Sequence, residues 1–202
     1  MYSKKIINNF IKLGIKTWLK SISDKIEIQK INLSVNKIFI SKIDKLYLEA
    51  INLVYQNLHI NKIIIKVCNC NLKFNYKNNF IYSDNLIINS YLSIDNINLE
   101  NIFFSRKWRS FRTEIQDKLT EGENVSNIFI NNNLITLTYE INKLYKEVIL
   151  SLNLEDDLIF FENIKNKKKI FLPFDKNIKF NSCEIKNKQI NIDLSSKVIF
   201  DD

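Results

Sequence analysis

Hydrophobic and polar residues alternate with a period of two along most of this chain, and such alternation predicts β-strands. The runs begin at Ile26, continue to about residue 90, and resume from residue 125 to residue 196. Their phase slips between Ile28 and Ile31, which predicts a β-bulge. Only short polar turns separate successive runs, whereas parallel neighbours need a crossover of about a dozen residues or more. We therefore expect an antiparallel meander.

A helical period replaces the alternation at the start of the chain. Residues 4–20 place Ile7, Phe10, Gly14 and Trp18 on one side of a helix. The opposite side carries polar and basic residues, namely Lys5, Asn9, Lys12, Lys16 and Lys20. This predicts an amphipathic helix that either docks on the sheet or lies on a membrane.

A second helical block follows in mid-chain. Residues 95–121 predict a helical pair, with Ser93 or Asp95 capping the first helix and Ser105 capping the second. Gly122 marks the end of the second helix. The apolar positions of the pair are Ile97, Leu99, Ile102, Phe103, Trp108, Phe111, Ile115 and Leu119.

These elements predict one α+β domain over residues 1–202, because no linker or low-complexity segment divides the chain. Its expected order is helix 4–20, strands 25–90, helices 95–121 and strands 125–196. The chain has only 2 Gly and 1 Pro, so Asn is expected to make the turns. Ile, Lys and Asn share A/T-rich codons, which weakens any inference from the net charge of +8.

Catalytic and metal-binding patterns are weak. The single histidine, His59, falls on the polar face of a predicted strand, and Cys68-Asn-Cys70 has no second pair of metal ligands nearby. We expect the cysteines, with Cys183, to be buried small hydrophobic residues in a reducing compartment. Two distant glycines cannot form a phosphate-binding loop. The expectation is a protein that is not an enzyme and uses no cofactor or metal.

No run of about 20 apolar residues predicts a membrane span. The first residues also lack the apolar run and small-residue cleavage site of a secretory signal. We expect a cytoplasmic location, or an equivalent interior compartment, with the protein peripherally associated with a membrane.

Apolar side chains are numerous relative to the three predicted helices that can cover the sheet. Either the core is filled, or a groove remains that is lined by Ile, Leu and Phe and suits acyl chains. The candidate groove residues come from the predicted helices and are Phe10, Trp18, Phe103, Phe104, Trp108, Phe111 and Ile115.

Two stretches resemble the LmeA-like phospholipid-binding family, formerly a cyanobacterial and actinobacterial domain of unknown function. They are residues 53–63 (LVYQNLHINKI) and 97–108 (INLENIFFSRKW), and residues 171–178 (FLPFDKNI) through Val198 are similar to the family's closing strands. The chain departs from the pattern at Asn57, where the family commonly has Gly, and at residues 95–98. The resemblance implies a tubular lipid-binding fold, with a long, twisted antiparallel sheet rolled around the N-terminal helix. It also implies that the protein is a phospholipid carrier or accessory.

Two basic clusters are candidates for contact with a head group or an anionic membrane, where each Lys or Arg contributes about 1 kcal/mol. They are Lys12, Lys16 and Lys20 on the first helix, and Arg106, Lys107, Arg109 and Arg112 in mid-chain. The run at residues 165–169 is expected to be a solvated hairpin loop. A filled-core structural or assembly protein remains an alternative, and a basic nucleic-acid-binding protein is a second, less favoured one. Nucleic acid is not expected as a partner because the aromatics lie apart from the lysines, and the pattern leaves the oligomeric state open.

Overall fold

A computed structural model describes residues 4–35, 42–71, 73–75, 80–82, 86–175 and 177–198. Within them the chain is α+β, and neighbouring strands pair antiparallel. The helices are α1 (Lys4–Ile22), α2 (Asn96–Phe104), a 3₁₀ turn (Arg106–Trp108) and α3 (Arg109–Leu119). The strands are β1 (Lys25–Val35), β2 (Lys42–Tyr55), β3 (Leu58–Asn71), β4 (Lys73–Asn75), β5 (Phe80–Tyr82), β6 (Leu86–Ile94), β7 (Val125–Asn131), β8 (Leu134–Ile141), β9 (Leu144–Glu155), β10 (Leu158–Asn163), β11 (Lys169–Phe171), β12 (Ile178–Lys186) and β13 (Gln189–Val198). The predicted strands of residues 25–90 lie partly outside the described residues.

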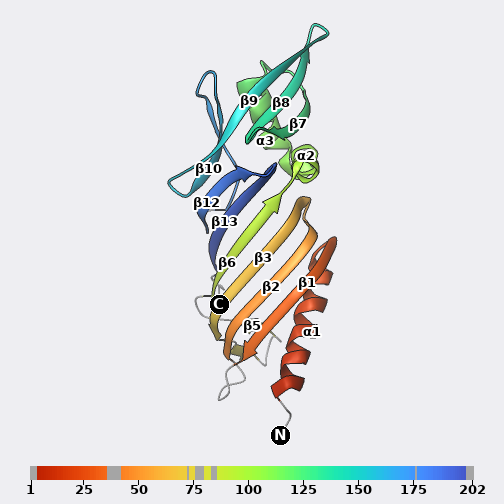
Figure 1. The fold of residues 1–202 in the computed structure, drawn as a ribbon, viewed down its shortest axis with the longest axis vertical. Coiled ribbons are helices and arrows are strands. Elements are labelled where there is room, and N and C mark those ends of the chain that lie inside the picture. The colour runs from red at the N-terminus through yellow and green to blue at the C-terminus, as the bar shows by residue number, and fades with distance from the viewer. Residues whose placement is uncertain are drawn as a thin grey trace.

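The described strands form two main sheets instead of the single long sheet that was predicted. The large sheet has six strands in the order β1-β2-β3-β6-β13-β12, and the small sheet has five in the order β11-β10-β9-β8-β7. β4 and β5 form a separate ribbon. Neither sheet closes into a barrel. The molecule is elongated, with the large sheet at one end and the small sheet, α2 and α3 at the other (Figure 1).

The large sheet has one continuous apolar face. The register aligns one residue from each strand in a row across the sheet, and all six are apolar: Ile28, Ala50, Ile63, Leu92, Ile192 and Cys183. Paired residues point to the same face of a sheet. One side of the large sheet therefore needs cover along its whole width.

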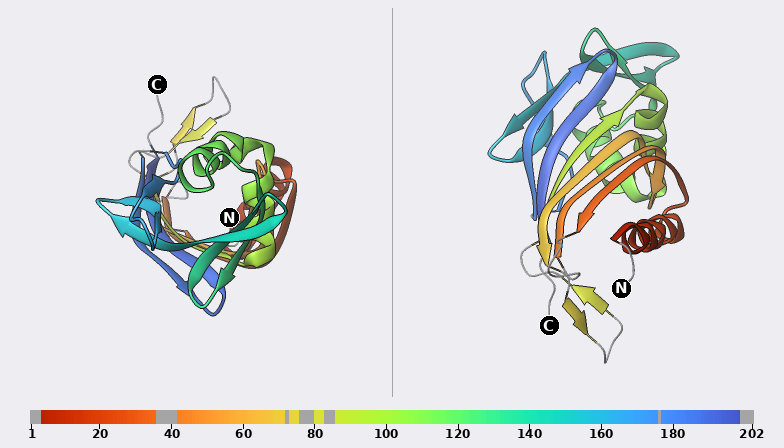
Figure 2. Two further views of the ribbon diagram at one scale, coloured as in Figure 1. Left: turned by 90° about the horizontal axis from the view of Figure 1, so that it is seen from above. Right: turned by 60° about the horizontal axis from the view of Figure 1, so that its bottom comes forward.

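The main core covers part of this face. It lies between the ends of β6, β12 and β13, the helices α2 and α3, and the small sheet (Figures 1 and 2). Its largest fully buried side chains include Phe103, Ile115 and Leu137. Two smaller clusters, around Ile43 and around Ala50, continue along the large sheet. Partly buried residues shared between the clusters, Leu58, Leu92 and Ile65, join them into one apolar track.

Polar residues make the hairpin turns, as predicted from the shortage of glycine. Asn57, Asn132, Asn133, Asn142 and Asn187 all have positive φ angles in tight turns between strands. Asp156 and Asp157 form the corresponding turn between β9 and β10. The predicted bulge is also present, because the register of β1 against β2 shifts between Ile28 and Lys30.

The predicted helical pair is present, with one difference at the second helix. Asp95 caps α2, its carboxylate accepting a hydrogen bond from the N–H of Asn98 at 2.9 Å. Ser105 makes no such cap, since its hydroxyl donates backward to the carbonyl of Ile102 at 2.8 Å. The chain passes through the 3₁₀ turn before α3 begins. Gly122, with φ of +87°, follows the end of α3.

α1 lies along β1 at the edge of the large sheet (Figure 1). Its half-buried apolar residues are Ile11, Ile15 and Leu19, whereas Phe10 and Trp18 are exposed. The helix thus packs at the edge of the large sheet, and the structure does not show a sheet rolled around it. Among the described residues, no helix has the length and apolar character needed to cross a bilayer.

The cysteine prediction is only partly right. Cys183 is partly buried against the main core, but Cys68 is exposed on β3, and the side chain of Cys70 lies outside what the structure describes. Cys68 alternates with Val67, which takes the buried position. A two-residue spacing on a strand fixes a shared face, but it does not say which face is buried.

Candidate functional site

A cavity with wholly apolar walls lies inside the main core. No charged side chain, hydroxyl or amide lines it. Its walls come from the large sheet, from α2 and α3, and from the small sheet. The lining residues are Leu58, Leu92, Ile94, Leu99, Ile102, Phe103, Trp108, Phe111, Ile128, Leu152, Ile159, Phe161, Leu172, Phe174, Ile190 and Ile192.

The volume open inside this cavity is about 50 Å³. A water molecule occupies roughly 10–15 Å³ on this measure, so the space takes about four groups the size of a methylene. Because the walls offer no hydrogen-bond partner, water gains nothing by entering. Leaving such a space empty costs on the order of 1 kcal/mol of folding free energy.

Three side chains, Phe174, Leu172 and Ile159, belong to the walls of both this cavity and a second, more open pocket of about 270 Å³, which we call the outer pocket. The outer pocket has polar walls as well, including Asp175, Asn177 and Lys179. Phe174 and Leu172 are half-buried, whereas Ile159 is buried.

Aromatic contacts hold Phe174 in this position. Its ring meets Trp108 edge to face with centroids 6.3 Å apart and lies 4.9 Å from the ring of Phe180. Trp108 in turn contacts Phe111 at 5.3 Å. The backbone is anchored on one side, where the N–H of Leu172 donates to the carbonyl of Ile159 at 2.9 Å. The wall is thus a packed cluster of rings on a short, irregular segment.

A polar network fixes the helix that supplies Leu99, Ile102 and Phe103 to the cavity. The side-chain carbonyl of Asn61, on β3, accepts the N–H of Asp95 at 2.6 Å and the amide of Asn98 at 2.8 Å. The amide of Asn61 also donates to the Asp95 carboxylate. On the other side, Asn96 accepts the N–H of Ile130 on β7 at 2.6 Å. α2 is therefore bonded to strands of both sheets.

Three of the seven predicted groove residues, Phe103, Trp108 and Phe111, line the cavity. Ile115 does not, because it is fully buried in the solid part of the core. Phe104 is 39% exposed on the outer side of α2, under the guanidinium of Arg112.

Phe10 and Trp18 are exposed on α1, away from the cavity. The helical period correctly placed these two on one side of α1 but did not show that Ile11, Ile15 and Leu19 form the packed side.

The predicted mid-chain basic cluster is partly committed to internal contacts. Arg112 donates to the carbonyl of Phe103 at 2.6 Å, and Lys107 donates to Gln56 at 2.8 Å. Arg106 and Arg109 remain exposed. The cluster therefore offers an anion three exposed cations, Arg106, Lys107 and Arg109, whereas Arg112 acts as a link between α2 and α3.

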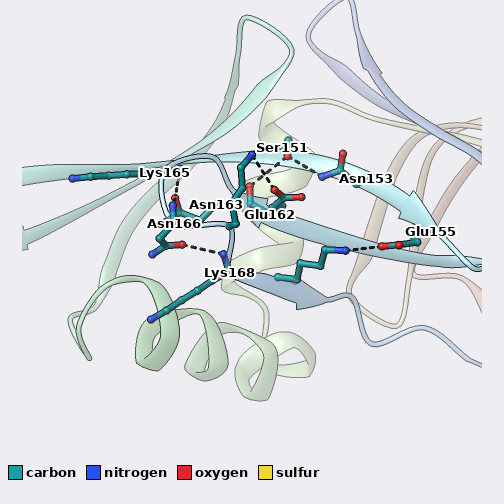
Figure 3. A network of polar contacts seen from close by, with 10 residues as sticks. Ser151, Asn153, Glu155, Glu162, Asn163, Lys165, Asn166 and Lys168 are labelled. Atoms are coloured by element: carbon teal, nitrogen blue, oxygen red, sulfur yellow. Dashed lines mark hydrogen bonds and ion pairs between the residues drawn. The ribbon is translucent and has the colours of Figure 1, made fainter.

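The lysine-rich loop between β10 and β11 is also paired internally (Figure 3). Asn163 orders it by accepting the N–H groups of Lys165 and Asn166. At its far end, Lys167 lies 3.1 Å from Glu162, and Lys169 lies 2.6 Å from Glu155. The contact with Glu155 raises the pKa of Lys169. This loop is thus a hairpin connection, as predicted, with much of its charge neutralised by neighbours.

The strand residues that line the cavity were missed by the sequence analysis. Leu92, Leu152 and Phe161 follow ordinary alternation, and nothing in that pattern separates a cavity wall from a filled core. Phe174 lies in residues 171–178, the segment that is similar to the family's closing strands. That similarity does not predict its contact with Trp108. Searches of protein-family models, curated proteins and solved structures find no match to this chain.

Proposed function

We propose that this protein is a non-catalytic lipid-binding protein that receives an acyl chain in its apolar cavity. The observation that carries the proposal is that sixteen side chains line the cavity and expose only apolar surface to it. Such walls offer no acid, base or nucleophile and no directional hydrogen bond. They favour a flexible hydrocarbon over a polar small molecule.

The size of the cavity sets a condition on this function. About 50 Å³ accepts only a few methylenes, so a longer chain requires Phe174 and Leu172 to turn aside. Each methylene buried from water contributes about 0.8 kcal/mol, which offsets the loss of the ring contacts after a few groups have entered. The outer pocket, lined by the three carboxylates of Asp156, Asp157 and Asp175 and by Lys179, then receives the polar end of the lipid.

The apolar track on the large sheet supports the same function. Leu58 and Leu92 belong both to the cavity wall and to the adjoining cluster around Ala50. A chain longer than the cavity has an apolar surface to follow along the sheet. A sheet that wraps a lipid in this way is the arrangement implied by the resemblance to the LmeA-like family, and membership of that family stays a prediction.

A bilayer also removes acyl chains from water, so moving a chain from the bilayer into the cavity changes its burial free energy little. Transfer to or from a membrane is then decided by the polar end of the lipid and by the approach to the surface. This favours a carrier or accessory at a membrane surface.

Quenching of tryptophan fluorescence tests the proposal. The chain has 2 Trp, so a Trp18→Phe variant leaves Trp108, beside the cavity, as its single reporter. Phospholipid with brominated acyl chains should quench this emission, and the same lipid without bromine should not. Emission from Trp108 that brominated lipid leaves unchanged would refute acyl binding in the cavity.

A further inference from the structure

α1 carries a second apolar surface that no described part of the protein covers. Phe10 is 70% exposed, and Leu13 and Trp18 are each 60% exposed. Gly14 lies between Phe10 and Trp18 at helical spacing, and a Cβ built on it would meet nothing within 4 Å. A contiguous apolar patch on a surface marks a binding site more often than chance exposure does.

We call this surface the α1 outer face and define it by Phe10, Leu13 and Trp18. A row of lysines adjoins it at Leu13 only, on the side of the helix opposite Phe10 and Trp18, where Lys12, Lys16 and Leu13 line a pocket with Ile31 of β1. Lys12, Lys16 and Lys20 follow one another at intervals of four residues along the helix, next to Leu13. α1 contains no acidic residue, and none of these three lysines has an ion-pair partner in the described part of the chain. The helix therefore presents apolar side chains beside uncompensated positive charge.

The α1 outer face differs in this respect from the other basic segments. The loop at residues 165–169 is paired with Glu155 and Glu162, and Arg112 is bound to backbone carbonyls. A helix with aromatic and aliphatic residues beside lysines suits the boundary of an anionic bilayer. There the rings reach the acyl region while the ammonium groups stay among the phosphates.

A second copy of the chain suits the α1 outer face less well than an anionic bilayer does. Its own α1 would bring more lysines and no carboxylate, so two outer faces have like charge. An anionic lipid surface supplies both the opposite charge and the apolar phase.

We propose that α1 is the membrane-docking element of this protein and that its outer face lies in the surface of an anionic bilayer. Ile11, Ile15 and Leu19 stay on the large sheet while Phe10, Leu13 and Trp18 enter the boundary region. The helix therefore lies flat on the membrane and holds the large sheet beside it. The proposal deepens the proposed lipid-binding function by naming the surface from which the lipid is exchanged.

The test uses the full chain with Trp108→Phe, so that Trp18 is the single reporter. The probes are vesicles of phosphatidylcholine, with and without phosphatidylglycerol and with bromine near the head-group end of the acyl chains. Trp18 emission should shift to shorter wavelength and be quenched only when phosphatidylglycerol is present. High salt should weaken the effect, because it screens exposed charges.

Paired charge reversals make the test specific. Lys16→Glu with Lys20→Glu should lower vesicle binding about tenfold or more, since each lysine adds favourable surface attraction. Lys186→Glu with Lys188→Glu makes the same change in net charge at the turn between β12 and β13, where both lysines are exposed. This control should bind like the parent. Equal losses in the two variants would mean that net charge alone drives binding, and α1 docking would then be wrong.

A variant of the apolar residues tests whether the α1 outer face binds a membrane or a second copy of the chain. Phe10→Ser with Leu13→Ser alters exposed side chains, so the fold should persist, as judged by an unchanged melting curve. We expect it to lose vesicle binding and to keep the oligomeric state of the parent in sedimentation. A change of oligomeric state with unchanged vesicle binding would instead assign the face to a second copy and overturn the proposal.

The two reporters keep this proposal distinct from the cavity function. Quenching of Trp18 without quenching of Trp108 would support docking and contradict acyl binding in the cavity. Quenching of Trp108 while Trp18 stays insensitive to vesicles would support the cavity and contradict docking.

Discussion

Trp108 and Phe174 meet edge to face beside the apolar cavity, with their ring centroids 6.3 Å apart and their planes at 80°. Trp108 comes from the 3₁₀ turn before α3, and Phe174 comes from the segment between β11 and β12. The contact joins two parts of the chain that are far apart in sequence. Both rings line the apolar cavity, and Phe174 also lines the outer pocket.

Removing one ring of this pair should open the cavity. In Phe174→Ala we expect faster uptake of a lipid with a fluorescent acyl chain and a shift of Trp108 emission to longer wavelength. The melting temperature should also fall. Replacing a fully buried aromatic side chain by Ala costs about 3–5 kcal/mol, and the loss here should be smaller because the Phe174 ring is only partly buried. Stopped-flow fluorescence measures the uptake. Uptake slower than that of the parent would show that Phe174 holds the lipid instead of closing the cavity.

The Asn61–Asp95 network should contribute measurably to stability. Asp95→Ala removes the cap of α2 and should cost about 1–2 kcal/mol. Asn61→Ala leaves partly buried groups without partners and should cost about 1–3 kcal/mol. Because both residues share hydrogen bonds, the double variant should lose less than the sum of the single losses.

Urea unfolding measures these free energies. Asn101→Ala, at an exposed position of the same helix, serves as the control and should change stability by no more than about 0.5 kcal/mol. Strict additivity of the Asn61 and Asp95 variants would rule out the coupling.

Arg112 and Arg109 lie on the same helix but should contribute differently to the free energy of unfolding. Arg112→Ala removes the bonds to the carbonyls of Phe103 and Ser105, and hydrogen bonds to charged groups contribute about 1.5–3 kcal/mol. Arg109 is exposed, so Arg109→Ala should change the unfolding free energy by about 0.5 kcal/mol or less. Thermal and urea unfolding distinguish them. Equal stability of the two variants would argue against a linking role for Arg112.

The two described cysteines should differ in reactivity. Burial raises the pKa of Cys183 from the ordinary 9.0 to about 12, whereas Cys68 is exposed. The folded protein therefore favours the neutral Cys183 thiol. The resulting stabilisation is present below the ordinary pKa and is lost as pH rises towards the raised value.

Labelling with iodoacetamide near neutral pH, in a Cys70→Ser background, should modify Cys68 and spare Cys183. Mass spectrometry of the digested protein locates the label. Rapid modification of Cys183 in the folded protein would contradict its burial.

Local features of the fold were predictable because they depend on neighbouring residues. The slip between Ile28 and Ile31 marked the bulge in β1, and Asn-rich pairs marked the turns. Asp95 was one of two expected caps for α2. Each of these reflects backbone preferences over a few residues.

Long-range pairing was not predictable in the same way. Leu92 on β6 pairs with Ile192 on β13, a hundred residues later, and alternation gives no information about such partners. For this reason the division into two sheets was missed.

The site shows the same limit. Helical spacing identified Phe103, Trp108 and Phe111, but the opposite wall comes from strands brought there by the fold. α1 illustrates it too, because a helix that is apolar on two sides does not reveal which side packs.

Analysis of co-purified lipid tests the central claim most directly. Gently purified parent protein should carry lipid with acyl chains, detected by native mass spectrometry and by extraction. Leu92→Phe places a ring in the cavity and should lose this lipid while keeping its melting temperature. Ile87→Phe, at an exposed position of the same strand, should keep the lipid. A parent protein that carries no lipid under any gentle extraction, or a Leu92→Phe variant that carries as much as the parent, would contradict the account.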